Sequence, residues 1–205
     1  MKWRASQIGK LMTNDRSGKN VGQTAINFVN QIAKQDFFGY ESPVINRYLD
    51  KGTNQELESI QLLNSVRFED FHKNAVRKTN EFITGECDIE TVSSIIDIKT
   101  SWSLDTFPEL PEEIDSKDYE WQGRAYMWLY NKPEFELVYC MVSTWDEFLT
   151  QYDDRLLHKV DHIDPAKRIT SIKFERDLEL EERMIERVKW ANEYYKERIN
   201  KLNKK

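Results

Sequence analysis

Apolar positions recur along the chain with two periods, and these periods separate predicted helices from predicted strands. Spacings of three and four residues predict helices at 7–12, 23–37, 45–63, 117–131 and 178 to about 202. Runs of β-branched and apolar residues predict strands at 75–79, on both sides of a turn at 91–94, at 135–142, and at an edge position over 169–174. This order predicts an α/β (α+β) fold in which helices flank a central mixed β-sheet.

The predicted helix over 45–63 follows a break at Pro43 and has Glu56 near its middle. Gly52 disfavours a helix interior by about 1 kcal/mol relative to Ala, so we expect it to mark a joint or a close approach. The apolar face expected to point inward is made by Tyr48, Leu49, Leu57 and Ile60.

The hairpin over 83–101 carries charge on one face. If the turn at 91–94 is symmetric, Glu90 pairs with Ile95 and Asp88 lies opposite Asp97, with Cβ atoms roughly 4.5–5.5 Å apart. Lys99 then lies on the same side and supplies one positive charge, and a divalent metal ion would supply the rest. The other, apolar face is expected to hold Cys87, Ile89, Ile96 and Ile98. An ordinary half-buried hairpin with one polar face is the alternative.

Composition limits the classes of protein to which the chain can belong. Its 205 residues are 39% hydrophobic and 32% charged, which fits one soluble domain. The sequence has neither the roughly 20-residue apolar run of a membrane span nor a signal peptide at its start, so we expect a cytoplasmic protein with no membrane partner. Cys87 and Cys140 are expected to be buried free thiols, too few for an iron–sulfur cluster. The net charge of −6 allows DNA binding in a narrow basic channel but disfavours a broad basic surface.

A second group of polar residues lies on the helix that follows the hairpin. Gln122 and Tyr126 are four residues apart and share one face, whereas Arg124 lies on a different side. Taken alone, Gln122 would be interpreted as a surface residue beside Tyr126 at the edge of the core. Taken alone, Glu56 would be interpreted as a solvated carboxylate on a helix.

Together and in this order, the motifs resemble those of the PD-(D/E)XK nucleases, and within them the phage lambda-type exonucleases, the YqaJ-like viral recombinase group. The matching segments are ASQIGKLMTNDRSGK at 5–19, GTNQE at 52–56, Asp88, Asp97 with Lys99, QGRAYMW at 122–128, and FERD at 174–177 before the last helix. The resemblance implies a restriction-endonuclease-like core in one domain, with N-terminal helices at 1–65, a catalytic sheet core at 66–175 and a C-terminal helix at 177–203.

The resemblance also implies roles for individual residues. Mg²⁺, for which Mn²⁺ can substitute, takes oxygen ligands, and these would come from Asp88, Asp97, the Ile98 carbonyl and Glu56. Lys99 would act on the attacking water or on developing negative charge, and Gln122 would orient Lys99 or a phosphate. Ser6, at a helix N-terminus, would contact a terminal 5′-phosphate. In all, the resemblance implies DNA contacts by five residues: Ser6, Arg4, Gln122, Tyr126 and Arg124.

The implied activity is 5′→3′ degradation of linear double-stranded DNA from its ends, leaving single strands for an annealing protein. A closed homotrimeric ring in the cytoplasm of a phage host is implied as well. Three departures from the family pattern are present. The usual arginine before the Ala-Ser pair has no counterpart except Arg4, the strand reads GECDI where the family commonly has Ser-Pro-Asp-Gly, and Asp97 replaces the commoner Glu. The alternatives are a RecB-like nuclease of other polarity or endonucleolytic action, and a catalytically silent DNA-binding subunit.

Overall fold

The β-branched run at 94–100 forms β5 (Ser94–Thr100) inside a four-stranded sheet, in a computed structural model that describes residues 1–41 and 46–204. β5 and β6 run parallel, and both outer pairs run antiparallel, which confirms the expected mixed sheet. The strand order is β4 (Ile89–Glu90), β5, β6 (Glu134–Cys140) and β7 (Ile169–Glu175), with β7 at the predicted edge. Pro43 and Ile45, where the sequence predicted a break and a helix start, lie outside the described residues.

A second, smaller sheet contains a strand that the sequence analysis missed. Its order is β1 (Trp3–Arg4), β3 (Ile83–Gly85) and β2 (Lys78–Thr79), with β1 parallel to β3. A two-residue strand is too short to show alternation. β1 forms because Ile83, far along the chain, provides its partner, so residues 1–65 contain more than the expected helices.

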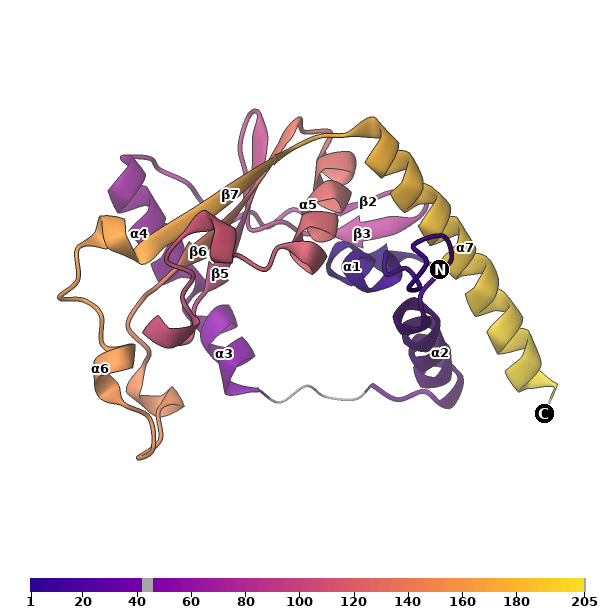
Figure 1. Ribbon diagram of the computed structural model, residues 1–205, viewed down its shortest axis with the longest axis horizontal. Coiled ribbons are helices and arrows are strands. Elements are labelled where there is room, and N and C mark those ends of the chain that lie inside the picture. Colours follow the sequence, from indigo (N-terminus) through magenta and orange to yellow (C-terminus); the bar gives the residue numbers. More distant parts are fainter. Residues whose placement is uncertain (42–45, 205) are drawn as a thin grey trace.

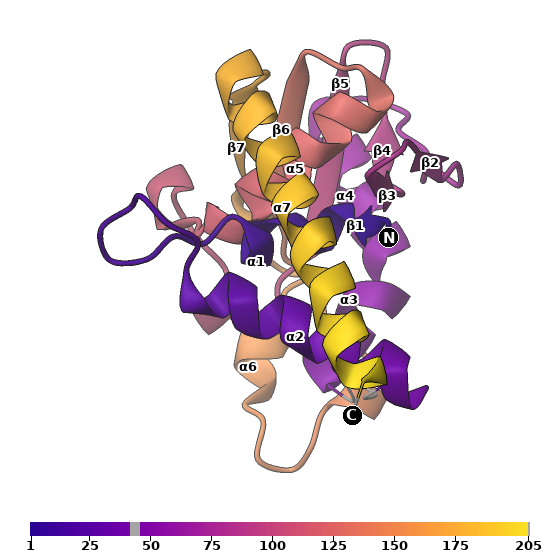
Figure 2. The same ribbon diagram turned by 90° about the vertical axis from the view of Figure 1, so that its right-hand side faces the viewer.

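Helices cover both faces of the four-stranded sheet (Figures 1 and 2). One face carries α5 (Lys117–Tyr130), α1 (Ile8–Leu11), α2 (Gln23–Phe38) and α7 (Leu178–Asn203), and the other carries α4 (Glu56–Arg67). The shorter helices are α3 (Arg47–Asn54), α6 (Arg155–His158), η1 (Ala5–Gln7), η2 (Leu104–Thr106), η3 (Pro111–Glu113), η4 (Asp146–Phe148) and η5 (Pro165–Arg168). Within 1–41 and 46–204, no helix combines the length and apolarity needed to cross a bilayer.

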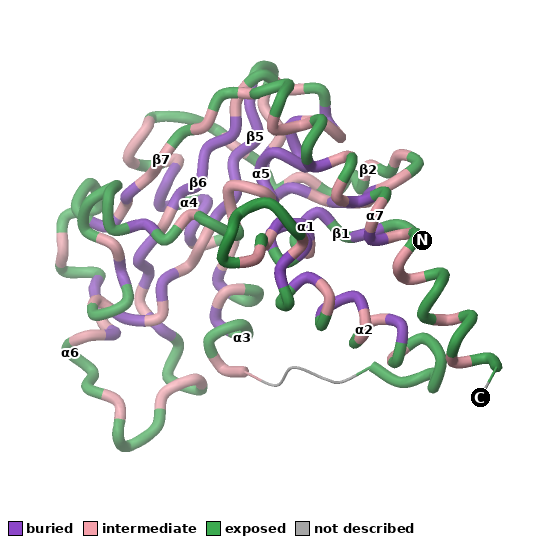
Figure 3. The backbone as a smooth tube through the Cα atoms, turned by 45° about the vertical axis from the view of Figure 1, so that its right-hand side comes forward, coloured by how far each residue is buried: buried purple, intermediate pink, exposed green. Residues whose placement is uncertain are grey.

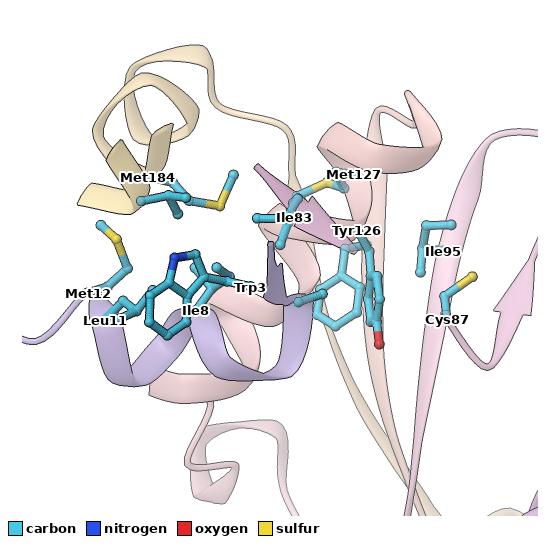
Figure 4. Packing of buried hydrophobic residues seen from close by; sticks show 14 of the residues in the cluster. Trp3, Ile8, Leu11, Met12, Ile83, Cys87, Ile95, Tyr126, Met127 and Met184 are labelled. Atoms are coloured by element: carbon cyan, nitrogen blue, oxygen red, sulfur yellow. The ribbon is translucent and has the colours of Figure 1, made fainter. Parts of the chain in front are cut away.

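The alternation of side chains in β5 divides the core into two apolar layers, and β5 and β6 are buried along most of their length (Figure 3). Ile95 points toward α5, whereas Ile96 and Ile98 pack beneath α4. In the α5-side layer, Trp3 lies beside Ile8 and Leu11 (Figure 4), which anchors the first residues of the chain to the core.

The expectation that Cys87 shares a face with Ile89, Ile96 and Ile98 is wrong. Cys87 packs with Ile95 and Tyr126 in the α5-side layer (Figure 4), because the regular strand begins only at Ile89 and the chain bends at Asp88. Cys87 and Cys140 are buried free thiols, as predicted. Burial raises the pKa of each thiol to about 12, so neither is reactive near neutral pH.

The helix predicted over 45–63 is two helices. α3 ends at Asn54 and α4 begins at Glu56, because Gln55 has φ −106° and ψ 14°, outside the helical range. The joint is therefore not at Gly52, and a Cβ atom at Gly52 would have no neighbour within 4 Å in the part of the chain that the structure describes. The predicted inward stripe is wrong for three members, Tyr48, Leu49 and Leu57, which are exposed, and correct for Ile60. The fully buried positions on these helices are instead Lys51, Gln55, Ser59 and Leu63.

Close packing of α5 on β6 depends on Gly123. A Cβ atom at this position would lie 2.0 Å from Cδ1 of Phe135, far inside van der Waals contact. The Phe135 ring is fully buried and stacks on Phe174 of β7 at 6.0 Å, so it has no room to move away. Only glycine lets α5 approach the sheet this closely, and the neighbouring Gln122 is thereby brought down to β5.

Gly123→Ala is expected to destabilise the fold by about 1–3 kcal/mol, because the added methyl group overpacks the core. In a chain of this size each kcal/mol lowers the melting temperature by about 2–4 °C, which thermal unfolding followed by circular dichroism will measure.

Gly52→Ala is the matched control, since no atom of the described residues lies within 4 Å of the added atom. It should leave stability unchanged or raise it by up to about 1 kcal/mol through helix propensity. Equal melting temperatures for Gly123→Ala and the wild type would contradict this account of the packing.

Candidate active site

The strand pairing in the hairpin determines where Asp88 and Asp97 lie relative to each other. Ile89 pairs with Ile96 and Glu90 with Ile95, which confirms the register inferred from a symmetric turn. The turn is closed by the Thr91 N–H, which donates to the Ser94 carbonyl at 2.9 Å. Regular pairing stops there, so Asp88 lies one residue outside β4 and is only half-buried.

The side chain of Asp88 replaces the missing backbone partner. In a continued ladder the Ile98 N–H would bind the Cys87 carbonyl, but it donates to Asp88 Oδ2 at 2.6 Å. The Cys87 carbonyl accepts from the Asn74 side-chain amide at 3.0 Å instead. Asp88 is thus tied to β5 beside Asp97. Burial, reinforced by the nearby Asp97 carboxylate, raises the pKa of Asp88 far above its usual range.

Asp97 and Lys99 form an ion pair on the α5 face of β5. Asp97 is only 2% exposed, and Lys99 Nζ lies 2.5 Å from its Oδ2. Apart from this contact with Lys99, Oδ2 has no partner among the described residues. Burial lowers the pKa of Lys99, but the Asp97 and Asp88 charges outweigh it and hold that pKa above its ordinary value.

Helix α5, which packs on this face of β5, holds the Asp97 carboxylate through a hydrogen bond. Gln122 Nε2 donates to Asp97 Oδ1 at 3.0 Å, and at 3.4 Å to the Tyr126 hydroxyl on the same helix face, as the four-residue spacing predicted. The Tyr126 hydroxyl in turn donates to the Glu86 carbonyl at 2.9 Å. This chain of hydrogen bonds fixes the orientation of the Gln122 amide and, through it, of the Asp97 carboxylate.

Glu56 reaches the site from the opposite layer. It is the first residue of α4, not a mid-helix residue, and its Oε2 accepts from Lys73 Nζ at 3.0 Å. Its Oε1 is buried without a hydrogen-bond partner among the described residues. The charge of Glu56 also contributes to the raised pKa of Asp88, so these two carboxylates lie close enough to interact.

Ser6 and Gln122 line one open cavity of about 560 Å³, together with Asp115, Lys117, Asp118, Tyr119 and Tyr139. The expectation that Ser6 begins a helix over 7–12 is wrong. Ser6 lies inside the 3-10 turn η1, and the α1 helix that follows has only four residues. So short a helix has little dipole to favour an anion, and an anion contact by Ser6 would come from its hydroxyl group.

The carboxylates of Asp88, Asp97 and Glu56 are the candidate ligands of a divalent cation. Within residues 1–41 and 46–204, no three His, Cys, Asp or Glu side chains form a ready-made metal cluster. Among the described residues, Glu56 Oε1 is nevertheless a buried oxygen without a hydrogen-bond partner, and Asp97 Oδ2 has only the Lys99 ammonium as its partner. Both lie beside Asp88, whose pKa is raised. Oxygen donors of this kind suit Mg²⁺, so the residues fit such an ion. The Ile98 carbonyl stays a predicted fourth ligand.

Neither a protein-family model nor a curated protein matches the chain. Among solved structures, the phage related exonuclease from Haemophilus somnus 129PT matches with a TM-score of 0.91 and 32% sequence identity, over 98% of this chain and 96% of that chain. The chain belongs to the phage lambda-type exonuclease family. It is therefore a nuclease, as the resemblance implied.

The fold of the exonuclease also matches the alkaline exonuclease LHK-Exo from Laribacter hongkongensis. The TM-score is 0.68 at 15% identity, over 99% of this chain and 92% of that chain. A structure of LHK-Exo in complex with dAMP matches with a TM-score of 0.67. At this level of identity the likeness extends to the fold alone.

The residues predicted to contact DNA differ in how far they are exposed to solvent. Arg124 is mostly buried, pairs with Glu120 at 2.6 Å and donates to the Glu175 carbonyl at 3.4 Å, so it ties α5 to β7. Tyr126 is buried in the hydrogen-bond chain below Gln122. Arg4, at the end of β1, is exposed, and so is Ser6 in η1. The geometry thus supports a structural role for Arg124 and a supporting role for Tyr126.

Sequence reasoning missed Tyr119, which contacts the lysine of the exonuclease site. Lys99 Nζ lies 4.6 Å from the centre of the Tyr119 ring, a cation–π contact. Tyr119 precedes Gln122 by three residues on α5 and so shares its face, which is the signal that could have identified it. Lys73, the partner of Glu56, lies in a segment without regular structure and gave no such signal.

Tyr119→Leu is expected to lower the single-turnover cleavage rate of the exonuclease about tenfold at saturating DNA, because a lost cation–π contact of about 1–2 kcal/mol releases the Lys99 ammonium. Tyr119→Phe keeps the ring and should cleave at close to the wild-type rate. An equal loss in both variants would assign the effect to the hydroxyl group and contradict the role of the ring.

Proposed function

We propose that this exonuclease hydrolyses the phosphodiester bonds of linear double-stranded DNA, 5′→3′, in a Mg²⁺-dependent reaction that leaves single strands for recombination. The observation that carries the proposal is the ion pair between the buried Asp97 and the half-buried Lys99, which is held by α5 beside Asp88. The 32% identity to a phage related exonuclease along nearly the whole chain supports the same reaction class.

Asp88, Asp97, Glu56 and the Ile98 carbonyl would hold Mg²⁺, or Mn²⁺ in its place. When bound, the ion supplies charge neutralisation at the phosphate and a water of lowered pKa. The chain's own contribution is to hold these oxygens in place through the Ile98 N–H and the Gln122 amide. Lys99, paired with Asp97 and seated on the Tyr119 ring, is held as a cation, which favours stabilisation of developing negative charge over proton abstraction.

The cavity shared by Ser6 and Gln122 would take the terminal nucleotide of the cleaved strand. Its volume of about 560 Å³ suits a ligand of that size, and the Ser6 hydroxyl would contact the 5′-phosphate. LHK-Exo, which shares the fold, has a structure in complex with dAMP, and this supports a nucleotide-sized site. Resection of linear phage DNA would take place in the host cytoplasm, where an annealing protein would receive the single strand.

A 5′-phosphorylated linear duplex, labelled separately at each end, tests the proposal. With Mg²⁺ the 5′ label should be released first as a mononucleotide, while a closed circle of the same sequence stays intact. Earlier release of the 3′ label or nicking of the circle would indicate the RecB-like alternative. No Mg²⁺-dependent release from any substrate would indicate a silent DNA-binding subunit.

Asp97→Asn and Lys99→Ala are the matched controls for this assay. Both should abolish cleavage, because the first removes a metal ligand and the second removes the cation. Asp97→Asn should bind DNA as well as the wild type or better, since it removes negative charge near the phosphates. Near-normal turnover in either purified variant would contradict this assignment of the site.

We further propose that the exonuclease works as a closed homotrimeric ring around its substrate. An acidic chain of net charge −6 can hold DNA if a few basic residues of each copy face a shared channel. Large exposed aromatic side chains at the end of α2 support contact with a second copy. They are Phe37, Phe38 and Tyr40, of which Phe38 is 62% exposed.

Light scattering at micromolar protein is expected to give about three times the 24.5 kDa of one chain, because the ring is closed and stable without DNA. Phe38→Glu should shift the mass toward that of the monomer by placing charge in the contact. A wild-type mass near 24.5 kDa with and without DNA would contradict the ring, and resection should then be distributive.

A further inference from the structure

Lys51 is a fully buried lysine that forms no ion pair within residues 1–41 and 46–204. Its ammonium group donates to the carbonyls of Ser101 at 2.7 Å, Trp102 at 3.1 Å and Val142 at 2.9 Å, and to Thr144 Oγ1 at 2.8 Å. Taking a charged group out of water is unfavourable unless it is fully hydrogen-bonded, and here four oxygens surround three N–H donors.

The carbonyls around Lys51 belong to the ends of the two central strands. Ser101 and Trp102 directly follow β5, the strand that carries Asp97 and Lys99, and Val142 lies just beyond β6. Thr144 Oγ1 also donates to the Trp102 carbonyl at 3.1 Å, so the two strand ends are joined to each other as well as to Lys51. Lys51 therefore links α3 to the carboxyl ends of both parallel strands.

Gln55, one helical turn after Lys51, makes a second attachment to the segment after β6. Its Nε2 donates to the Ser143 carbonyl at 2.8 Å, and its Oε1 accepts from the Trp145 N–H at 3.3 Å. Gln55 is also the residue at which α3 ends and α4 begins, and its own N–H donates to the Lys51 carbonyl at 2.9 Å. Lys51 and Gln55 together set the position of the joint.

Glu56 is the residue that follows this joint. Among the described residues its carboxylate has one partner, the Lys73 side chain on an irregular segment, and its second oxygen is buried without a hydrogen bond. The position of Glu56 relative to Asp88 and Asp97 is therefore determined by the joint more than by contacts of the carboxylate itself. A small rotation at the joint would move Glu56 away from the other two carboxylates.

We propose that Lys51 is a positioning residue for the divalent-cation site, because its buried ammonium group holds the α3–α4 joint and thereby sets Glu56 opposite Asp88 and Asp97. This inference rests on the proposed metal-dependent function. Burial is the main cause that lowers the pKa of Lys51, to about 7. The four surrounding oxygens favour the ammonium form, since a neutral amine has only two N–H donors.

Lys51→Met keeps most of the length of the side chain and removes the donors. Mn²⁺ binding to the full-length variant, measured from the free-ion signal in electron paramagnetic resonance below its melting temperature, should weaken at least about tenfold, the size of loss typical for residues that orient metal ligands. The Mg²⁺ concentration for half-maximal cleavage should rise by a similar factor.

Arg67→Met is the matched control on the same helix. Arg67 pairs with the buried Glu136 at 2.6 Å near the far end of α4, so this variant should also melt earlier. Its Mn²⁺ affinity should stay close to that of the wild type, because the joint is intact. Equal weakening in both variants would assign the effect to general destabilisation and overturn the proposal.

Wild-type Mn²⁺ affinity in a folded Lys51→Met variant would show that Lys51 is only structural and would overturn the inference while the proposed function stands. If the wild type itself bound no Mn²⁺, the proposed function and this inference would both be wrong. Thr144→Val removes a single oxygen from around the ammonium and covers the case in which Lys51→Met does not fold. It should weaken Mn²⁺ binding less strongly, and unchanged binding would overturn the proposal.

Discussion

The burial of the Asp97 carboxylate is the constraint on which the surrounding structure depends. An ionised carboxylate with almost no solvent contact is strongly unfavourable unless nearby groups compensate its charge. Lys99 supplies the opposite charge, and the Gln122 amide supplies a hydrogen bond to the second oxygen. Apart from Lys99, Asp97 Oδ2 has no partner among the described residues, so the paired carboxylate could also receive a cation.

Compensating Asp97 requires α5 to lie close to the sheet, and this requirement explains the composition of the helix. Gly123 permits the approach, whereas Tyr119, Gln122 and Tyr126 project from the same face onto the charged pair and the residues beside it. Arg124 points the other way and fastens α5 to β7 through the Glu175 carbonyl. These four side chains therefore either support the site or fix the helix that supports it.

The parts of the site that could be predicted from sequence are those that depend on local periodicity. A turn of four residues and the two-residue period of strands were enough to give the pairing of Glu90 with Ile95 and the common face of Asp97 and Lys99. The same reasoning failed for Cys87, because where a strand ends depends on partners elsewhere. Here the Asn74 side chain takes the Cys87 carbonyl out of the ladder.

The prediction for 45–63 failed for a different reason. Tyr48, Leu49 and Leu57 form a plausible apolar stripe, and a helix normally buries such a stripe. The structure buries Lys51 and Gln55 instead, because carbonyl groups after β5 and β6 satisfy them. Those partners lie far along the chain and belong to segments without periodicity, so no local pattern could have shown that this face would be inward.

The layer opposite α5 is where directional bonds matter most for the position of a ligand. Ile60, Leu62 and Leu63 pack α4 onto the sheet, but apolar contact is non-directional and would tolerate sliding or rotation of the helix. Polar bonds hold both ends instead, through Lys51 and Gln55 at the joint and through Arg67 with Glu136 near the last turn. A helix held in this way has one position on the sheet. The first residue of that helix is Glu56, so Lys51 and Gln55, at the same end of the helix, determine where its carboxylate meets those of β5 and the hairpin, whereas Arg67 fixes only the far end.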